Sequence, residues 1–240
     1  MADTISRVGK EVDPAAYGPG QAAEEKKFGV PGPAVRECLL ALNPSLRGPI
    51  GQLLDRKFYD CAAAPEEQPK NCYETVAYVK GLDYLSRRQV YEESVGPIMA
   101  DQDKVSELLA AGGYRKVAES FPFHNVKGQA NTVELVVGVK LSAIPKNLKS
   151  GDLVLFGGRG LNSKGEEVDR FTHAMVYLGR HGGKHYVFEK INKECGPGSP
   201  YQIISLEAVL VQLIGMPSTH NNIYIDRVFA LRSFNKTAGR

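Results

Sequence analysis

The sequence contains no long hydrophobic run. None of its 240 residues belongs to an apolar stretch of the ~18 residues that indicate a membrane-spanning helix. Residues 1–20 lack the apolar centre of a secretory signal. We therefore expect no integral membrane association. The protein is expected to be secreted or periplasmic if the chain begins after a removed signal, and cytoplasmic otherwise.

The chain also lacks a strong excess of charge of either sign. It has 30 Lys and Arg residues and 27 Asp and Glu residues, a net charge of +3, and the basic residues are dispersed. Nucleic-acid binding is typical of concentrated basic patches, so this balance predicts no nucleic-acid partner. A mildly basic surface is compatible, though only weakly, with an anionic polymer such as cell wall.

Cysteine is scarce, and no two cysteines have CxxC spacing. The four are Cys38, Cys61, Cys72 and Cys195. Too few histidines lie near them for a zinc site, so we expect no metal. Cys38 and Cys61 could form a disulfide if the protein is exported; the alternative is two ordinary thiols.

Length and a hydrophobic content of 42% predict one domain with additions. Residues 1–32 carry Pro, Gly and a charged cluster without apolar periodicity, which predicts a flexible or strap-like segment. Residues 33–240 then form a single domain. It begins with two short helices, which we expect to be broken at residues 43–44 and 48–49, where a proline follows Asn or Gly.

Three short apolar runs predict a small antiparallel sheet. They span residues 152–156, 172–178 and 185–189, are rich in Val, Leu, Tyr and Phe, and are bounded by Gly. The GRHGG span, residues 179–183, predicts a hairpin loop of five residues. Later segments predict a strand at 201–204, a helix from Ser205 and one or two closing strands, giving a sheet of five or six strands.

His173 lies near the start of the middle strand. Side chains alternate along a strand, so His173, Met175 and Tyr177 are expected to share one face. A strand histidine is more often structural than functional. His173 therefore needs a reactive partner before it indicates a site.

Cys72 supplies that partner, because it begins a predicted helix. Val76 and Val79 follow at helical spacing, and Asn71 is a good cap. The N–H groups and dipole at a helix start favour a thiolate, and a neighbouring imidazole favours it further. The alternative is a buried small hydrophobic residue. Together, Cys72 and His173 favour a nucleophile and its base.

The order of these segments resembles the NlpC-type papain-like cysteine peptidases. The matching parts are Asn71-Cys72, LKSGDLVLF at residues 148–156 and HAMVYLG at residues 173–179, and the likeness covers about half of the chain. It implies an α+β fold in which the nucleophile helix packs on an antiparallel sheet. It also implies a cysteine hydrolase that cleaves an amide bond in bacterial cell-wall peptides through a thioester, with a peptide or muropeptide substrate and no cofactor.

The resemblance gives roles to particular residues. Cys72 would be the nucleophile, His173 the general base, and a polar residue of the next strand would orient the histidine. We prefer Glu189, which ends the apolar run, and His185 and Asn192 are alternatives. A glutamate departs from the His, Asn or Gln that is frequent there.

Other features leave alternatives open. Tyr59 and Tyr73 are candidate oxyanion or substrate contacts, although such tyrosines more often pack. Residues 86–147 form an insertion, with a predicted helical part at 105–121 and a strand in 131–144, and we expect it to determine substrate choice. We interpret His124, within it, as structural. The alternative functions are an acyltransferase of the same superfamily and a non-catalytic binding module.

Overall fold

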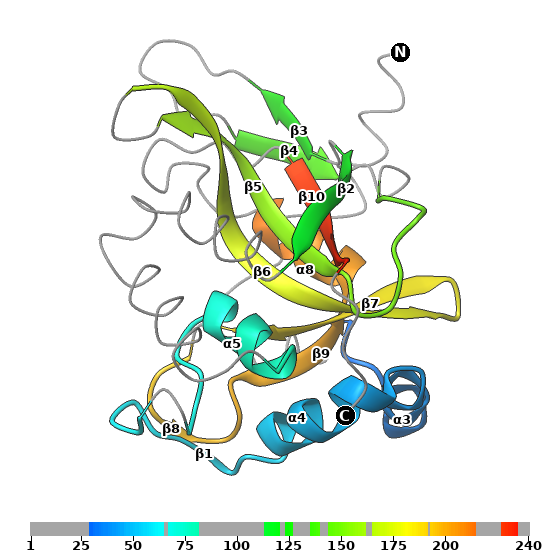
Figure 1. Ribbon diagram of the computed structural model, residues 1–240, viewed down its shortest axis with the longest axis vertical. Helices are drawn as coiled ribbons and strands as arrows, with labels where there is room; N and C mark the ends of the chain where they lie inside the picture. Colours follow the sequence, from blue (N-terminus) through cyan, green and yellow to red (C-terminus); the bar gives the residue numbers. More distant parts are fainter. Residues whose placement is uncertain are drawn as a thin grey trace.

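A computed structural model describes residues 29–64, 67–81, 113–120, 123–126, 135–139, 144–161, 165–191, 193–214 and 227–234. The fold is α+β: an open antiparallel sheet with helices packed against both of its faces (Figure 1). The strap-like segment predicted for residues 1–32 lies outside the described residues, apart from 29–32. No helix in the described ranges is long and apolar enough to cross a membrane.

The main sheet has six strands, each antiparallel to its neighbours, which agrees with the predicted number. In spatial order they are β2 (Tyr114–Ser120), β10 (Arg227–Ser233), β5 (Leu153–Leu161), β6 (Glu167–His181), β7 (Lys184–Lys190) and β9 (Tyr201–Ser205). Two smaller pairings join β1 (Phe58–Tyr59) to β8 (Gly196–Pro197), and β3 (Phe123–Val126) to β4 (Leu135–Val139).

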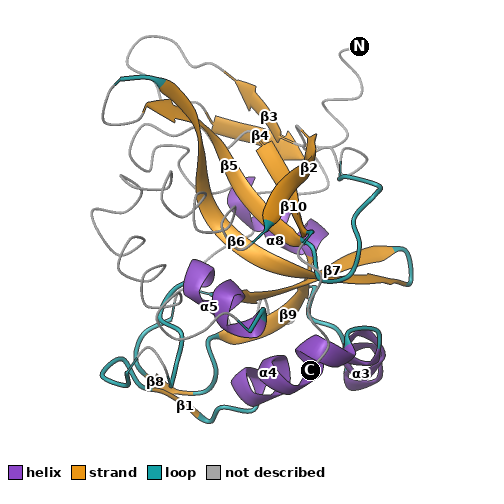
Figure 2. Ribbon diagram, viewed as in Figure 1, coloured by secondary structure: helices purple, strands orange, loops and turns teal. Residues whose placement is uncertain are grey.

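Alternating side chains divide the core into two clusters, one on each face of the sheet. Ala174, Val176 and Leu178 of β6 join the cluster beneath α3 (Pro33–Ala41), α4 (Pro44–Leu54) and α5 (Cys72–Val79). Met175 and Tyr177 join the cluster beneath α8 (Leu206–Ile214). Figure 2 shows α3, α4 and α5 gathered toward β7 and β9, with α8 on the far side of the strands. The predicted alternation of β6 is confirmed.

The two N-terminal helices are less interrupted than predicted. The break before Pro44 is present, but Pro49 lies inside α4. A proline inside a helix removes one backbone hydrogen bond and crowds the carbonyl four residues before it, which disfavours but does not forbid the helix. The buried side chains of Ile50 and Leu53 follow directly and hold the rest of the helix on the core.

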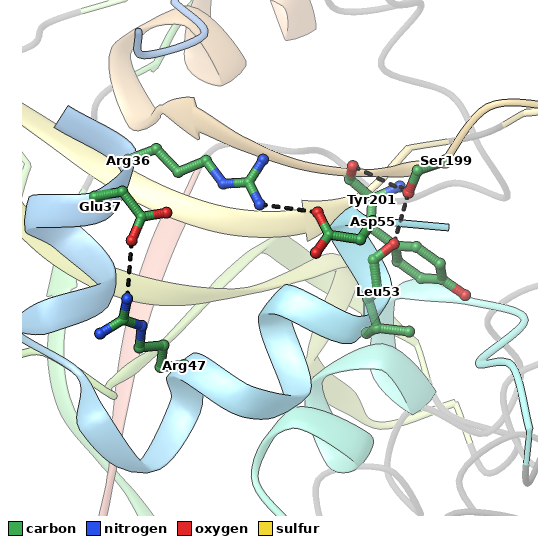
Figure 3. Close-up of polar contacts among 7 residues, drawn as sticks. All are labelled: Arg36, Glu37, Arg47, Leu53, Asp55, Ser199 and Tyr201. Carbon is green, nitrogen blue, oxygen red and sulfur yellow. Dashed lines mark hydrogen bonds and ion pairs between the residues drawn. The ribbon is translucent and has the colours of Figure 1, made fainter. Parts of the chain in front are cut away.

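Polar contacts fix these helices to each other and to the sheet (Figure 3). Arg36 of α3 pairs with Asp55 at 3.2 Å. Arg47 of α4 pairs with Glu37 of α3 at 3.0 Å. The Ser199 hydroxyl, just before β9, donates to the Leu53 carbonyl at 2.9 Å. The exposed ion pairs add little stability, so the buried leucines and Ile50 carry most of this packing.

The hairpin between β6 and β7 is tighter than the predicted five-residue loop. His181 pairs with Lys184, which leaves only Gly182 and Gly183 in the turn. Their φ angles are +56° and +85°, and a two-residue turn with positive φ at both positions matches the twist of the flanking strands. Arg180 and His181 therefore extend β6.

The region expected to be an insertion contributes to the main sheet. Tyr114–Ser120 forms strand β2, paired with β10, where the spacing had predicted helix. Pairing with a neighbouring strand, together with burial of Tyr114 and the 2.8 Å ion pair from Arg227 to Glu119, overrides a weak local preference. The predicted strand in residues 131–144 is present as β4. His124 lies on β3, and residues 86–112 lie outside the described residues.

The disulfide differs from the one considered. Cys61 bonds to Cys195, with Cα atoms 5.5 Å apart, and Cys38 is an exposed free thiol on α3. The pairing of Tyr59 with Gly196, between β1 and β8, brings these two cysteines together. A partner 134 residues away cannot be found from sequence spacing.

Candidate active site

The candidate site begins at the N-terminus of α5, where Cys72 is the first helical residue, as predicted. The side chain of Asn71 accepts a hydrogen bond from the Glu74 N–H at 2.8 Å and so caps the helix. The buried Glu74 carboxylate reaches back to the Lys70 N–H at 2.6 Å. This reciprocal arrangement resembles a capping box, and it fixes the turn that presents the thiol.

The Cys72 thiol meets the sheet at the point where β6 and β7 separate. The pair of residues farthest from the turn in the ladder between these strands is Val176 with Phe188. Continuing that register places Ala174 opposite Lys190. The Ala174 N–H instead donates to the Cys72 sulfur. The Cys72 residue as a whole is of intermediate exposure, at the rim of the core cluster beneath α5.

His173 lies beside this thiol and joins it to Glu189. Nε2 of His173 lies 2.8 Å from Oε2 of Glu189, and the side chains are 22% and 4% exposed. The imidazole also shares a hydrogen bond with Cys72. Since Nε2 faces the carboxylate, Nδ1 is the ring atom left for the thiol. The order of contacts is therefore thiol, imidazole, carboxylate.

The charges of these groups reinforce one another. Burial raises the pKa of the Cys72 thiol, but the charge and hydrogen bond of His173, with smaller effects of the Ala174 N–H and the Lys190 charge, leave the pKa below its usual value. Burial lowers the pKa of His173, but Cys72 and Glu189 together raise it to about 10. At neutral pH this favours a thiolate beside an imidazolium.

Glu189 is the one candidate for the third position that contacts His173 among the described residues. It is 3% exposed, not a surface acid. Burial raises the pKa of its carboxyl, but the His173 hydrogen bond and charge hold the pKa below the usual range. His185 instead lies with Nδ1 2.9 Å from the Tyr177 hydroxyl. Asn192 lies outside the described residues.

Gln202 is a contact that the sequence analysis missed. Its amide nitrogen donates to Oε1 of Glu189 at 2.7 Å, directly across the β7–β9 pair. Both carboxylate oxygens of Glu189 are thus occupied, one by Gln202 and one by His173. The available signal was a glutamine between the tyrosine and the two isoleucines of the segment YQIIS.

Lys190 was also missed as a member of the site. It is 8% exposed, and its ammonium lies 4.8 Å from the centre of the Tyr59 ring. It is one of the charges that lower the pKa of the Cys72 thiol.

The two candidate tyrosine contacts are buried. Tyr73 is 8% exposed and belongs to the core cluster beneath α5. Tyr59 is 5% exposed, with its ring beneath the ammonium groups of Lys70 and Lys190. This burial fits the packing alternative for both residues.

A cavity of about 540 Å³ lies between α3, α4 and β9. Its lining includes Val30, Arg36, Tyr201 and Gln202, and Figure 3 shows Arg36 and Tyr201 in this region. Because Gln202 also donates to Glu189, the cavity lies next to the Glu189 end of the series of contacts from Cys72 through His173 to Glu189. Within the described ranges, no group of three or more His, Cys, Asp or Glu residues could hold a metal ion.

Comparison with protein-family models, with curated proteins and with solved structures finds no match for this chain. The function is therefore inferred from the geometry of the site.

Proposed function

We propose that the protein is a cysteine hydrolase with a papain-like core that cleaves an amide bond through a thioester intermediate. The observation that carries this proposal is the contact chain from Cys72 through His173 to Glu189 at a partly exposed helix N-terminus. A nucleophile, a base and a group that orients the base are the parts that acyl transfer requires.

In the proposed reaction, the Cys72 thiolate attacks the amide carbonyl carbon. The Cys72 N–H, which has no acceptor within α5 because Cys72 is the first helical residue, and a neighbouring donor stabilise the oxyanion. The His173 imidazolium gives its proton to the leaving amine as the carbon–nitrogen bond breaks, which leaves a thioester. Neutral His173 then takes a proton from a water molecule, whose oxygen attacks the thioester and releases the acid and the thiolate.

We propose peptides of bacterial cell wall as the substrate, on the resemblance to the NlpC-type peptidases. Purified protein is incubated with digested peptidoglycan and, separately, with casein, and the products are identified by mass spectrometry. We expect one defined muropeptide fragment from the wild type and none from Cys72→Ala or His173→Ala. Casein cleavage with intact muropeptides would overturn the substrate, and no product from either would overturn the hydrolase.

Matched controls are available for both residues. Cys38→Ala removes the other free thiol, which is exposed on α3. His185→Gln changes the histidine that contacts Tyr177 instead of Glu189. Both variants are expected to retain turnover, so that loss of activity is assigned to Cys72 and His173 and not to thiol or imidazole content.

A further inference from the structure

We propose that Lys190 is the electrostatic partner of the Cys72 thiolate, acting from the side of the sheet opposite to Glu189. This inference rests on the proposed function, because it assigns a role toward the proposed nucleophile. It adds a positioning cation to the chain formed by Cys72, His173 and Glu189.

Strand geometry places Lys190 on the side of α5. Adjacent side chains of a strand point to opposite faces, and Glu189 faces His173, so Lys190 faces the other way. Its partner on β9 is Tyr201, which belongs to the core cluster beneath α5. On its other side, β7 neighbours β6. Extending the pairing of Val176 with Phe188 by two residues places Lys190 opposite Ala174, whose N–H donates to the Cys72 sulfur.

The surroundings of Lys190 supply too little negative charge for a buried ammonium. The residue is 8% exposed, and Nζ donates to the Ile191 carbonyl at 3.3 Å and lies over the Tyr59 ring. In the described part of the chain, no carboxylate forms an ion pair with it. A buried charge without a counter-charge is costly, and a thiolate at Cys72 would offset that cost.

Three charged groups act on the Lys190 ammonium: the Cys72 thiolate, Lys70 and Glu74. Burial lowers the pKa of Lys190. Among the charged groups the Cys72 thiolate has the largest effect and raises this pKa; Lys70 lowers it and Glu74 raises it by smaller amounts. Lys70 repels Lys190 and donates to the Asp60 carbonyl. Glu74 attracts it, but one of its oxygens accepts from the Lys70 N–H.

Lys190 therefore complements His173 by a different kind of contact. His173 contacts the sulfur and exchanges its proton during the reaction. Lys190 takes no part in the proton transfer, so it continues to favour the thiolate after His173 has given its proton to the leaving group. That property would assist release of the thiolate from the thioester in the second half of the reaction.

The test measures the Cys72 thiolate directly and needs no substrate. In a Cys38→Ala background, Cys72 is the one thiol left free, because Cys61 and Cys195 are bonded. Thiolate absorbance near ~240 nm is followed against pH, with the Cys38→Ala/Cys72→Ala protein subtracted to remove tyrosine ionisation. We expect Lys190→Met to raise the thiol pKa by about one unit, a tenfold loss of thiolate below the midpoint. Lys190→Arg, which keeps the charge, is expected to restore most of it.

Lys80→Met is the matched control. Lys80 lies at the other end of α5, is half-buried, and also stacks over a tyrosine, Tyr114, at 5.8 Å. Removing it deletes the same charge without reaching Cys72. Equal midpoints for Lys190→Met and Lys80→Met would overturn the inference.

If Lys190→Met does not fold, the reciprocal measurement decides. Coupling between two sites is mutual, so removing the thiolate by Cys72→Ala must lower the Lys190 pKa. NMR of lysine labelled with ¹³C at Cε measures that pKa in both proteins, and an unchanged value would overturn the inference. Absence of a low-pKa thiolate in the Cys38→Ala parent would instead refute the proposed function.

Discussion

Replacing Glu189 with Gln isolates the contribution of one charge to His173. The carboxylate accepts from His173 through Oε2 and from Gln202 through Oε1. An amide keeps one acceptor for His173 and turns a donor toward Gln202, whose own amide can rotate to accept it. The substitution therefore preserves the hydrogen bonds and removes the negative charge.

The size of the effect follows from the difference between a charged and a neutral acceptor. Hydrogen bonds to charged groups contribute about 1.5–3 kcal/mol, and neutral ones about 1 kcal/mol. A difference of about 1.4 kcal/mol equals one pKa unit. The His173 pKa, raised to about 10 by Cys72 and Glu189 against the effect of burial, should fall by about one unit.

The raised pKa of His173 also makes the folding stability depend on pH. A histidine whose pKa is raised by folding contributes stability that is complete below its unfolded value, about 6.5. That contribution is lost as pH rises through about 10 in the wild type. In Glu189→Gln the contribution should be exhausted about one unit lower, so the denaturant midpoints of the two proteins should differ at neutral pH and converge above about 10.

NMR titration of the imidazole Cε1–H signals measures the His173 pKa directly. The protein has five histidines, and the signal that disappears in His173→Gln identifies the one required. Glu207→Gln is the control, because that carboxylate accepts from the backbone N–H of His185 and not from His173. A wild-type His173 that titrates near ~6.5 would refute the ion-pair reasoning, as would a value unchanged by Glu189→Gln.

Three further predictions concern other parts of the molecule. Iodoacetamide below pH ~8 should label Cys72 faster than the exposed Cys38, because its thiol pKa is lowered, and peptide mass spectrometry checks this; equal rates would indicate a packed thiol. Cys61→Ser/Cys195→Ser should lower the free energy of unfolding by about 2–5 kcal/mol, measured by denaturant titration, because the bond closes a long loop. Arg232→Met should cost about 3–5 kcal/mol, because the Asp152 carboxylate, 2% exposed, would lose its two contacts with Arg232 at 2.8 and 2.7 Å and keep the one from the Lys149 N–H; a change within experimental error would mean that the pair is not a structural anchor.

Features encoded over a few neighbouring residues could be predicted from the sequence. Asn71 and Cys72 specify a capped helix start through local hydrogen bonds. Alternation along β6 and β7 correctly grouped His173 with Met175, and Glu189 with Val187. These expectations needed no knowledge of which strands are neighbours.

Features that depend on distant neighbours could not be predicted. Gln202 and Lys190 join the site because β9 pairs with β7 and α5 lies across β6 and β7. The Cys61–Cys195 bond depends on the pairing of β1 with β8. Strand β2 exists because β10, which follows more than 100 residues later, supplies its partner. Each of these contacts joins segments whose separation along the chain hides the relation.

A bulge in β6 determines which of two adjacent residues faces His173. From the turn, Gly179 pairs with Tyr186, but Tyr177 pairs with Val187, so Leu178 is an extra residue on β6. Without it, Met175 would lie opposite Lys190, and the ammonium would share the face of His173. Gly179 permits the bulge because its φ is +135°, a conformation that side chains disfavour. The placement of Glu189 beside His173, and of Lys190 on the side of α5, thus depends on a bulge that this one glycine permits.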